Sequence, residues 1–313
     1  MNPRGLIIAL VVLGALGGVL YWSQNRKPPE AAVPASTAPV ILRVNVAAVN
    51  QIAIKGKTPV TLEKKHDGAW QISQPKPYPA DQEAVVGILS TLSGLNADRV
   101  VEDKASNLKQ YGLEPPVVEV DINSTARAPQ QLLLGDETPA GGNVYAALAG
   151  DPRVFTIASY SKSSLDKGLN DFRDKSLVTL SPDKVSRVEL LRKPQEIEFD
   201  RTKDGWQILK PSSSPADSSA VNELVRSLTS ARMDLSSAGT TDAGTEFAHA
   251  TGVATAKLTG DAGTQTLEVR KNKDNYYAKS SVVDGAYKVD STLGQALDKK
   301  LDDFQSKDQS KKK

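Results

Sequence analysis

Cysteine is absent from the 313 residues, and histidine occurs only at His66 and His249. Without thiols the chain can form no disulfide, thiolate zinc site or iron–sulfur cluster. The two histidines are far apart in sequence, and neither has another ligand type at metal-site spacing. We therefore predict no metal and no cofactor. Because no catalytic motif is present with all the elements that it requires, we also predict no catalytic residue.

Aromatic residues and excess charge are scarce as well. Only 5% of residues are aromatic, and the net charge is +2. That charge belongs to the ends: residues 1–40 and 307–313 are basic, which leaves 41–306 mildly acidic. A nucleic-acid-binding protein needs a basic face to neutralise phosphates, so we predict no nucleic-acid partner. The apolar and charged shares, 39% and 24%, are those of a globular protein.

One long apolar run lies near the N-terminus. Residues 5–22 read GLIIALVVLGALGGVLYW, without a charge. A helix of that length is about 27 Å long, close to the thickness of a bilayer's hydrocarbon core. We predict an uncleaved anchor in the lipid bilayer, with the N-terminus inside and the body outside the cytoplasm. A cleaved signal peptide is the alternative. Gly14 and Gly18 have the spacing of a helix-dimer face.

The rest of the chain contains two copies of one unit. Trp70-Gln71-Ile72 recurs as Trp206-Gln207-Ile208, and Pro79-Ala80-Asp81 recurs as Pro215-Ala216-Asp217. Recurrence of a whole pattern at one offset indicates duplication. The predicted parts are an anchor with its flanks (1–27), a proline-rich linker (28–40), unit 1 (41–180), unit 2 (181–306) and a basic tail (307–313).

Each copy has the pattern of antiparallel strands with a covering helix. Asp67-Gly68 and Asp204-Gly205 predict hairpin turns, because glycine accepts a positive φ. Asp81 and Asp217 are placed to cap a helix whose apolar residues recur at i, i+3, i+4 and i+7. Further short segments are predicted as a helix over 161–171 and, in the second copy, as strands at 257–259 and 266–269.

The predicted fold class is α+β, with an N-terminal transmembrane helix followed by two repeated units of antiparallel sheet with covering helices. The connection at 176–184 is short, so we expect the two units to touch.

Three local patterns resemble functional motifs, and each also has a structural interpretation. Residues 55–58, KGKT, end like a phosphate loop, but Gln51 stands where that loop needs glycine. Ser164 and Lys167 match S-x-x-K without the other elements that such enzymes require. Trp70 and Trp206 are candidate interaction or groove residues, although a repeated tryptophan in a strand is more often part of a core.

Several segments resemble a known bacterial family. They are WQI at 70–72, PAD at 79–81, YGLEPP at 111–116, LGDETP at 134–139 and FRDK at 172–175. Over most of 45–180 the chain is similar to an uncharacterised family of membrane-anchored proteins with a domain of unknown function. The similarity fades over 185–305. Members often accompany gliding-motility-type ABC transport systems, so the resemblance implies an accessory role in the envelope and no catalytic residues.

These observations favour a single-pass accessory or scaffolding protein of the bacterial inner membrane. Its body would lie in the periplasm and bind a membrane protein, such as a component of an ABC-type transport system. One alternative is an envelope module that binds glycan or peptide in a groove between the units. A second alternative is an envelope hydrolase that uses carboxylates or Ser164 and Lys167.

Overall fold

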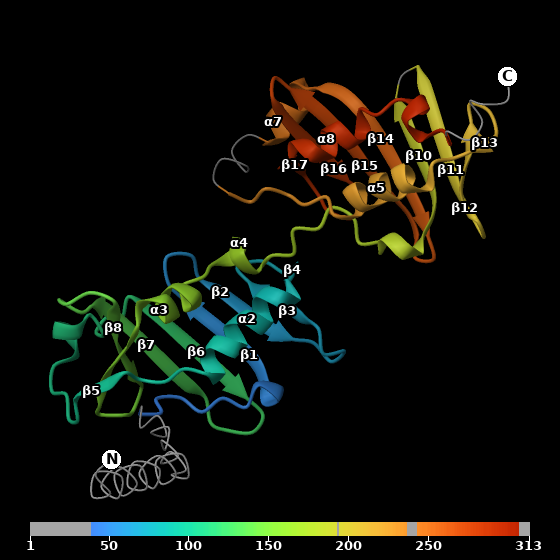
Figure 1. Ribbon diagram of the computed structural model, residues 1–313. Helices are drawn as coiled ribbons and strands as arrows, with labels where there is room; N and C mark the ends of the chain where they lie inside the picture. The colour runs from blue at the N-terminus through green and yellow to red at the C-terminus, as the bar shows by residue number, and fades with distance from the viewer. Residues whose placement is uncertain (1–38, 193, 237–242, 307–313) are drawn as a thin grey trace, which may run out of the picture.

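Strands that follow one another in sequence pair into two antiparallel sheets, one in each half of the chain (Figure 1). The computed structural model describes residues 39–192, 194–236 and 243–306. The predicted anchor with Gly14 and Gly18, nearly all of the linker and the basic tail lie outside these residues. Within them, no helix is both long and apolar enough to cross a membrane.

The first sheet has nine strands in the order β4-β3-β2-β1-β6-β7-β8-β9-β5. The strands are β1 (Val49–Lys55), β2 (Val60–Lys64), β3 (Trp70–Gln74), β4 (Tyr78–Pro79), β5 (Arg99–Glu102), β6 (Val118–Ser124), β7 (Gln130–Glu137), β8 (Asn143–Leu148) and β9 (Val154–Ala158). At its centre, Ile52 of β1 lies opposite Leu62 on one side and Ile122 on the other. All three side chains are buried.

The second sheet repeats this connectivity with eight strands, in the order β13-β12-β11-β10-β14-β15-β16-β17. The strands are β10 (Val185–Arg192), β11 (Gln195–Thr202), β12 (Gly205–Lys210), β13 (Ser214–Pro215), β14 (Thr251–Gly260), β15 (Gly263–Asn272), β16 (Asn275–Ser280) and β17 (Ala286–Val289). Val188 opposite Leu258 corresponds to Ile52 opposite Ile122. The predicted pair of antiparallel sheets is confirmed, and strands outweigh helices.

Strands β14 and β15 are longer than the segments predicted at 257–259 and 266–269. In β14 the buried side chains are Ala254, Ala256 and Leu258, which alternate with more exposed residues. Alanine is too weakly hydrophobic to signal a strand by itself. The alternation becomes visible only when small residues are read as part of the core.

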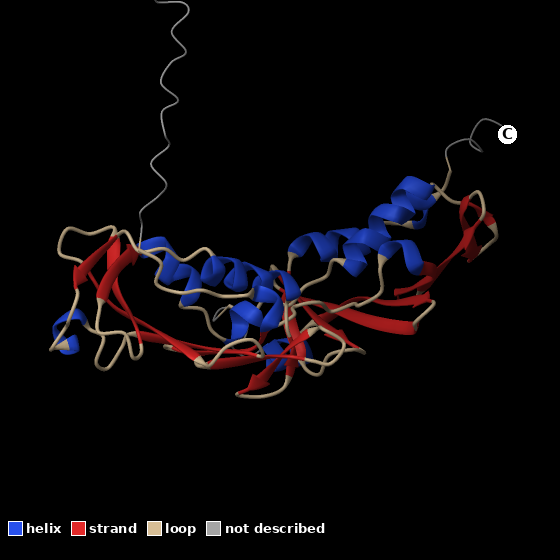
Figure 2. Ribbon diagram, turned by 90° about the horizontal axis from the view of Figure 1, so that it is seen from below, coloured by secondary structure: helices blue, strands red, loops and turns tan. Residues whose placement is uncertain are grey.

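Helices cover one face of each sheet. The longest of the described helices are α2 (Gln82–Ser93) and α5 (Ser218–Thr229), and their predicted apolar stripes are buried: Val85, Ile88, Leu89 and Leu92, and Val221, Leu224, Val225 and Leu228. The predicted caps are confirmed, since Asp81 and Asp217 each accept two backbone N–H groups of the first turn. In Figure 2 most helices of both units lie on one side of the molecule, and a few short ones lie on the side of the sheets.

Shorter helices complete the layers. They are η1 (Val46–Ala48), η2 (Leu108–Tyr111), α3 (Ser159–Leu165), α4 (Leu169–Phe172), η3 (Pro182–Lys184), α7 (Ala243–His249), α8 (Ser291–Leu297) and η4 (Leu301–Phe304). The single helix predicted over 161–171 is therefore two, α3 and α4. Gly168 lies between them, packed so closely on Thr58 that a Cβ there would overlap the threonine hydroxyl.

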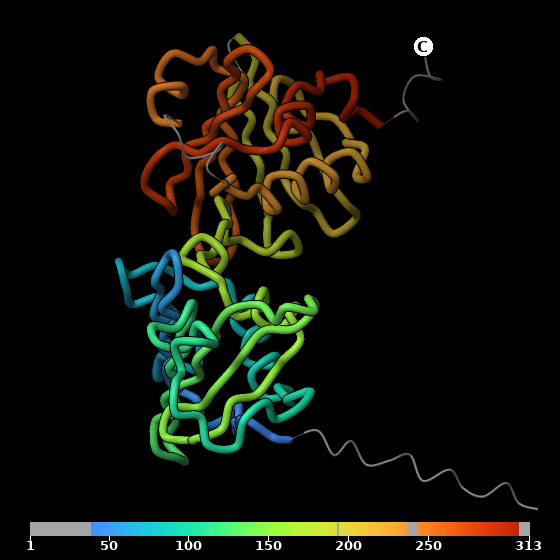
Figure 3. The backbone as a smooth tube through the Cα atoms, turned by 90° about the vertical axis from the view of Figure 1, so that its left-hand side faces the viewer, coloured from blue at the N-terminus to red at the C-terminus, as the bar shows by residue number. Residues whose placement is uncertain are grey.

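The two units touch through the segment around Arg173, where the chain crosses from one to the other (Figure 3). The Arg173 guanidinium lies 4.3 Å from the ring centre of Tyr78 in the first unit and 5.5 Å from that of Tyr287 in the second. It also donates a hydrogen bond of 2.9 Å to the Tyr287 hydroxyl. Nearby, the Asn170 amide donates to the Leu235 carbonyl. The junction is therefore a polar contact centred on one arginine.

Replacing Arg173 by alanine should loosen this junction. Loss of two cation–π contacts and one hydrogen bond should raise the rate of proteolytic cleavage within residues 174–184 by roughly tenfold. Limited proteolysis of the full chain measures this rate. Arg127→Ala, at an exposed residue of the β6–β7 turn, is the control and should leave it unchanged. Equal rates for both variants would contradict the proposed role of the arginine.

The cap of α8 should give a pH-dependent contribution to stability. Asp290 accepts hydrogen bonds from the Thr292 hydroxyl (2.7 Å) and backbone N–H (2.8 Å). These bonds hold the pKa of Asp290 below its ordinary value. A lowered folded-state pKa stabilises the fold above the unfolded value of about 3.9 and loses that effect as the pH falls through the folded pKa.

Asp290→Asn keeps a cap that does not titrate. Urea denaturation from pH 7 to pH 3 should therefore show the wild-type chain losing stability relative to Asp290→Asn only below about pH 4. A difference between the two chains that stays constant over this range would show that Asp290 contributes nothing through its charge.

Candidate functional site

The two repeated tryptophans occupy equivalent positions in separate sheets. Trp70 begins β3 and Trp206 lies in β12, and each belongs to the hydrophobic core of its own unit. Their exposed fractions are 7% and 5%. The structure does not bring them together, and neither presents a ring face to solvent.

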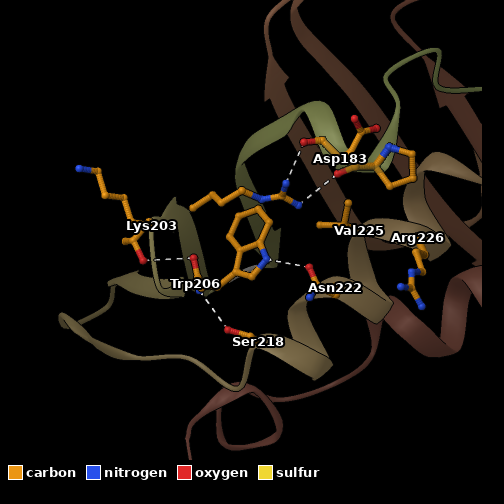
Figure 4. A pocket seen from close by; sticks show the side chains of 11 residues that line it. Asp183, Lys203, Trp206, Ser218, Asn222, Val225 and Arg226 are labelled. Atoms are coloured by element: carbon orange, nitrogen blue, oxygen red, sulfur yellow. Dashed lines mark hydrogen bonds between the residues drawn. The ribbon is translucent and has the colours of Figure 1, made fainter.

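Trp206 borders a cavity of about 450 Å³ (Figure 4). Its indole N–H donates to the Asn222 side-chain oxygen at 2.9 Å. The Arg201 guanidinium lies 4.9 Å from the ring centre and donates to the carbonyls of Pro182 and Asp183. In Figure 4 the Lys203 and Arg226 side chains point away from the indole. The ring and its N–H are thus already engaged, and the arginine connects β11 to η3.

The first unit holds its tryptophan differently. The Gln82 side chain accepts from the Trp70 backbone N–H at 2.8 Å and donates to the Trp70 carbonyl at 2.9 Å. At the position corresponding to Asn222, counted from the capping aspartate, the first unit has Val86, which is exposed. The polar surroundings of the indole are therefore a property of the second copy.

A larger concavity lies at one end of the second sheet. This trough, about 1200 Å³ in volume, is bordered by the β10–β11 hairpin, the beginning of β14 and the end of β15. Leu191 lies in it with 36% of its surface exposed, although its neighbour Leu190 is buried in the core. Because side chains alternate along a strand, Leu191 lies on the sheet face turned away from α5.

Charged side chains follow that face from the trough along β10 and β11. Glu198 is only 8% exposed, and its carboxylate lies 3.1 Å from Lys210 and 3.5 Å from Arg187. Lys210 also contacts Glu196 at 2.9 Å. The hydrogen bonds that Lys210 donates to Glu196 and then to Glu198 raise its pKa above the ordinary value. This face of β10, β11 and β12 is therefore covered by charged side chains that form ion pairs.

The other reactive patterns do not form a site. The Ser164 hydroxyl donates to the Tyr160 carbonyl one turn earlier in α3, which is an ordinary intrahelical bond. Lys55 ends β1, residues 56–58 lie in the turn, and strand β2 follows, so the segment lacks the helix that a phosphate loop precedes. Within the described parts of the chain, no three His, Cys, Asp or Glu side chains are grouped as metal ligands would be.

Two of the segments that carry the family resemblance pack on each other. Gly112 ends η2 with a φ of 64°, and a Cβ there would meet the carboxylate of Asp136. A Cβ at Gly135 would overlap the Tyr111 carbonyl oxygen. The Lys162 ammonium donates to the Gly135 carbonyl at 2.9 Å. YGLEPP and LGDETP are thus two halves of one backbone contact, which sequence reasoning did not foresee.

The chain is thus a protein of two antiparallel sheets. The YGLEPP and LGDETP motifs that carry its family resemblance form a packing contact within the fold. The chain matches the family described as "Domain of unknown function (DUF4340)" over residues 70–235 and 206–310. It belongs to that family. Comparison with curated proteins and with solved structures finds no match.

The close contact at Gly135 should make that position intolerant of any side chain. Gly135→Ala forces the β7 backbone and the Tyr111 carbonyl apart, and we expect a loss of about 2–4 kcal/mol in the free energy of unfolding. Gly87→Ala in α2 is the matched control. A Cβ there meets nothing within 4 Å, and the change should add up to about 1 kcal/mol. Urea denaturation of both variants measures the two effects, and equal stabilities would contradict the close contact.

Proposed function

We propose that the chain is an accessory or scaffolding protein held at the outer side of a bacterial cytoplasmic membrane by residues 5–22. In this proposal it acts by binding a membrane protein, such as a component of an ABC-type transport system. The apolar run supports the anchor, and the family resemblance supports the partner class. The contact surface that we assign is the trough at the end of the second sheet, and this observation carries the proposal.

The trough has the properties of a protein-binding surface. Its volume exceeds that of the Trp206 cavity, and it combines the exposed Leu191 with side chains of both charges, including Glu268 and Arg270. Protein interfaces typically place apolar contacts inside a polar rim. Anchoring would confine the trough near the bilayer and raise its effective concentration for a membrane partner.

The two alternatives gain less from the geometry. A glycan-binding groove usually needs an aromatic face against which a sugar can pack, whereas Trp70 and Trp206 are 7% and 5% exposed. A hydrolase needs its groups within hydrogen-bond reach in a cleft, and Ser164 bonds to its own helix.

Site-specific crosslinking in native membranes tests the proposal. A photoreactive phenylalanine derivative at Leu191 should give a crosslink to a membrane protein, identified by mass spectrometry. The matched control is Val282, which lies in the same unit between β16 and β17 and is 39% exposed, against 36% for Leu191. Crosslinks from Leu191 to no membrane protein in repeated trials, or identical products from both positions, would count against the trough as the contact surface.

Fractionation tests the anchor separately. The full chain should sediment with membranes and resist extraction at alkaline pH, whereas a chain that begins at residue 39 should not. Recovery of the full chain in the fraction without membranes would overturn the anchoring part of the proposal.

A further inference from the structure

Inside the trough, the N-terminal end of β14 extends beyond the end of the neighbouring strand β10. On one side β14 pairs with β15 from Thr251 onward. On the other side its pairing with β10 reaches only as far as Thr255, opposite Leu191. Among the described residues, Thr251 to Ala254 therefore have a paired strand on the β15 edge only, and all four line the trough. Unpaired backbone groups along a strand edge are a template for a further strand.

The first unit closes the same edge. Counted from the equivalent residues Ile122 and Leu258, Thr251 and Gly252 correspond to Pro115 and Pro116. Proline has no backbone N–H to donate and is a common means of blocking an edge. Gly56, in the turn after β1, also packs within reach of the Val118 side chain at the start of β6. The second copy therefore has backbone N–H groups at both positions, and one of the two points to the open edge because consecutive N–H groups along a strand face opposite sides.

The charged side chains that line the trough indicate which kind of peptide strand would pair with β14. Arg192 contacts Asp298 at 3.0 Å, Arg270 contacts Glu268 at 2.7 Å, and Lys257 contacts Glu189 at 3.3 Å. Lys271, opposite Thr251, and Lys273 also line the trough. Neither has a carboxylate within 4 Å among the described residues, and the Lys271 ammonium lies over the Tyr276 ring. The trough is thus lined by five cationic and three acidic side chains, and two of the cations have no acidic partner among the described residues.

We propose that the overhanging edge of β14 binds an extended, acidic peptide segment of another protein by strand addition. Main-chain hydrogen bonds to residues 251–254 would supply affinity, and carboxylates facing Lys271 and Lys273 would favour acidic sequences. This inference rests on the proposed function, because it specifies the chemistry of the partner at the same trough.

The probe is a fluorescein-labelled synthetic peptide of about eight residues that alternates valine with glutamate. A second peptide alternates valine with lysine. Fluorescence anisotropy with the purified full chain in zwitterionic detergent should show binding of the acidic peptide only, and the binding should weaken as salt is raised. Hydrogen exchange should become slower at the amides of 251–254 when the acidic peptide is bound. No binding of the acidic peptide, or slower exchange elsewhere only, would overturn the inference.

Two variants separate the strand edge from the charges. Lys271→Glu with Lys273→Glu should weaken the acidic peptide by about tenfold or more and allow the basic peptide to bind. Gly252→Pro copies the first unit and should abolish binding of the acidic peptide. Gly252→Ala keeps the N–H, its Cβ meets nothing within 4 Å, and it should bind as the wild type does. Should Gly252→Pro fail to fold, the charge-reversed chain decides: unchanged peptide preference there refutes the inference.

The crosslinking and peptide experiments fail independently. A membrane protein crosslinked at Leu191, without peptide binding, would leave the scaffolding proposal standing and remove strand addition. Peptide binding with no membrane protein crosslinked would support the open edge and remove the assigned class of partner.

Discussion

Burial of one helix stripe against one face of each sheet is the constraint on which the rest of the structure depends. Val85, Ile88, Leu89 and Leu92 of α2 meet the side chains that β1, β2 and β6 turn inward, and α5 does the same in the second unit. Each sheet can bury only one face in this way, so the opposite face must be polar or covered locally. The chain uses both solutions. Ion pairs surround Glu198 on the outer face of the second sheet, and small apolar clusters lie under η2 and α7.

Duplication with divergence explains why the two copies share a core but differ at their surfaces. The equivalent pairs Ile52–Ile122 and Val188–Leu258 occupy the sheet centres, where a change of shape would be felt by many neighbours. Surface positions are less constrained. There Val86 is replaced by Asn222, and the proline pair that follows η2 in the first copy is replaced by Thr251 and Gly252. The first unit has the glycine contact between YGLEPP and LGDETP, whereas the second has a longer strand β14 at the corresponding place.

Features set by neighbouring residues could be predicted from the sequence, and features set by distant ones could not. The caps at Asp81 and Asp217, the Asp-Gly turns and the helix stripes depend on local spacing, and they are as expected. The fit of Gly135 against the Tyr111 carbonyl joins segments that no periodicity connects. The trough depends on how far β14 overhangs β10. Comparing the copies residue by residue would have exposed the lost prolines, but not the edge that they leave open.

Arg173, which contacts Tyr78 and Tyr287, affects how far the second unit can move relative to the first. A guanidinium that contacts one ring in each unit opposes rotation of the units as well as their separation, because either movement lengthens a cation–π distance. The second unit therefore does not rotate freely about the segment that connects it to the first. If the chain is anchored in a membrane as proposed, the distance of the second sheet from the lipid and its orientation would follow those of the first sheet. A partner would then approach the second sheet from a narrow range of angles.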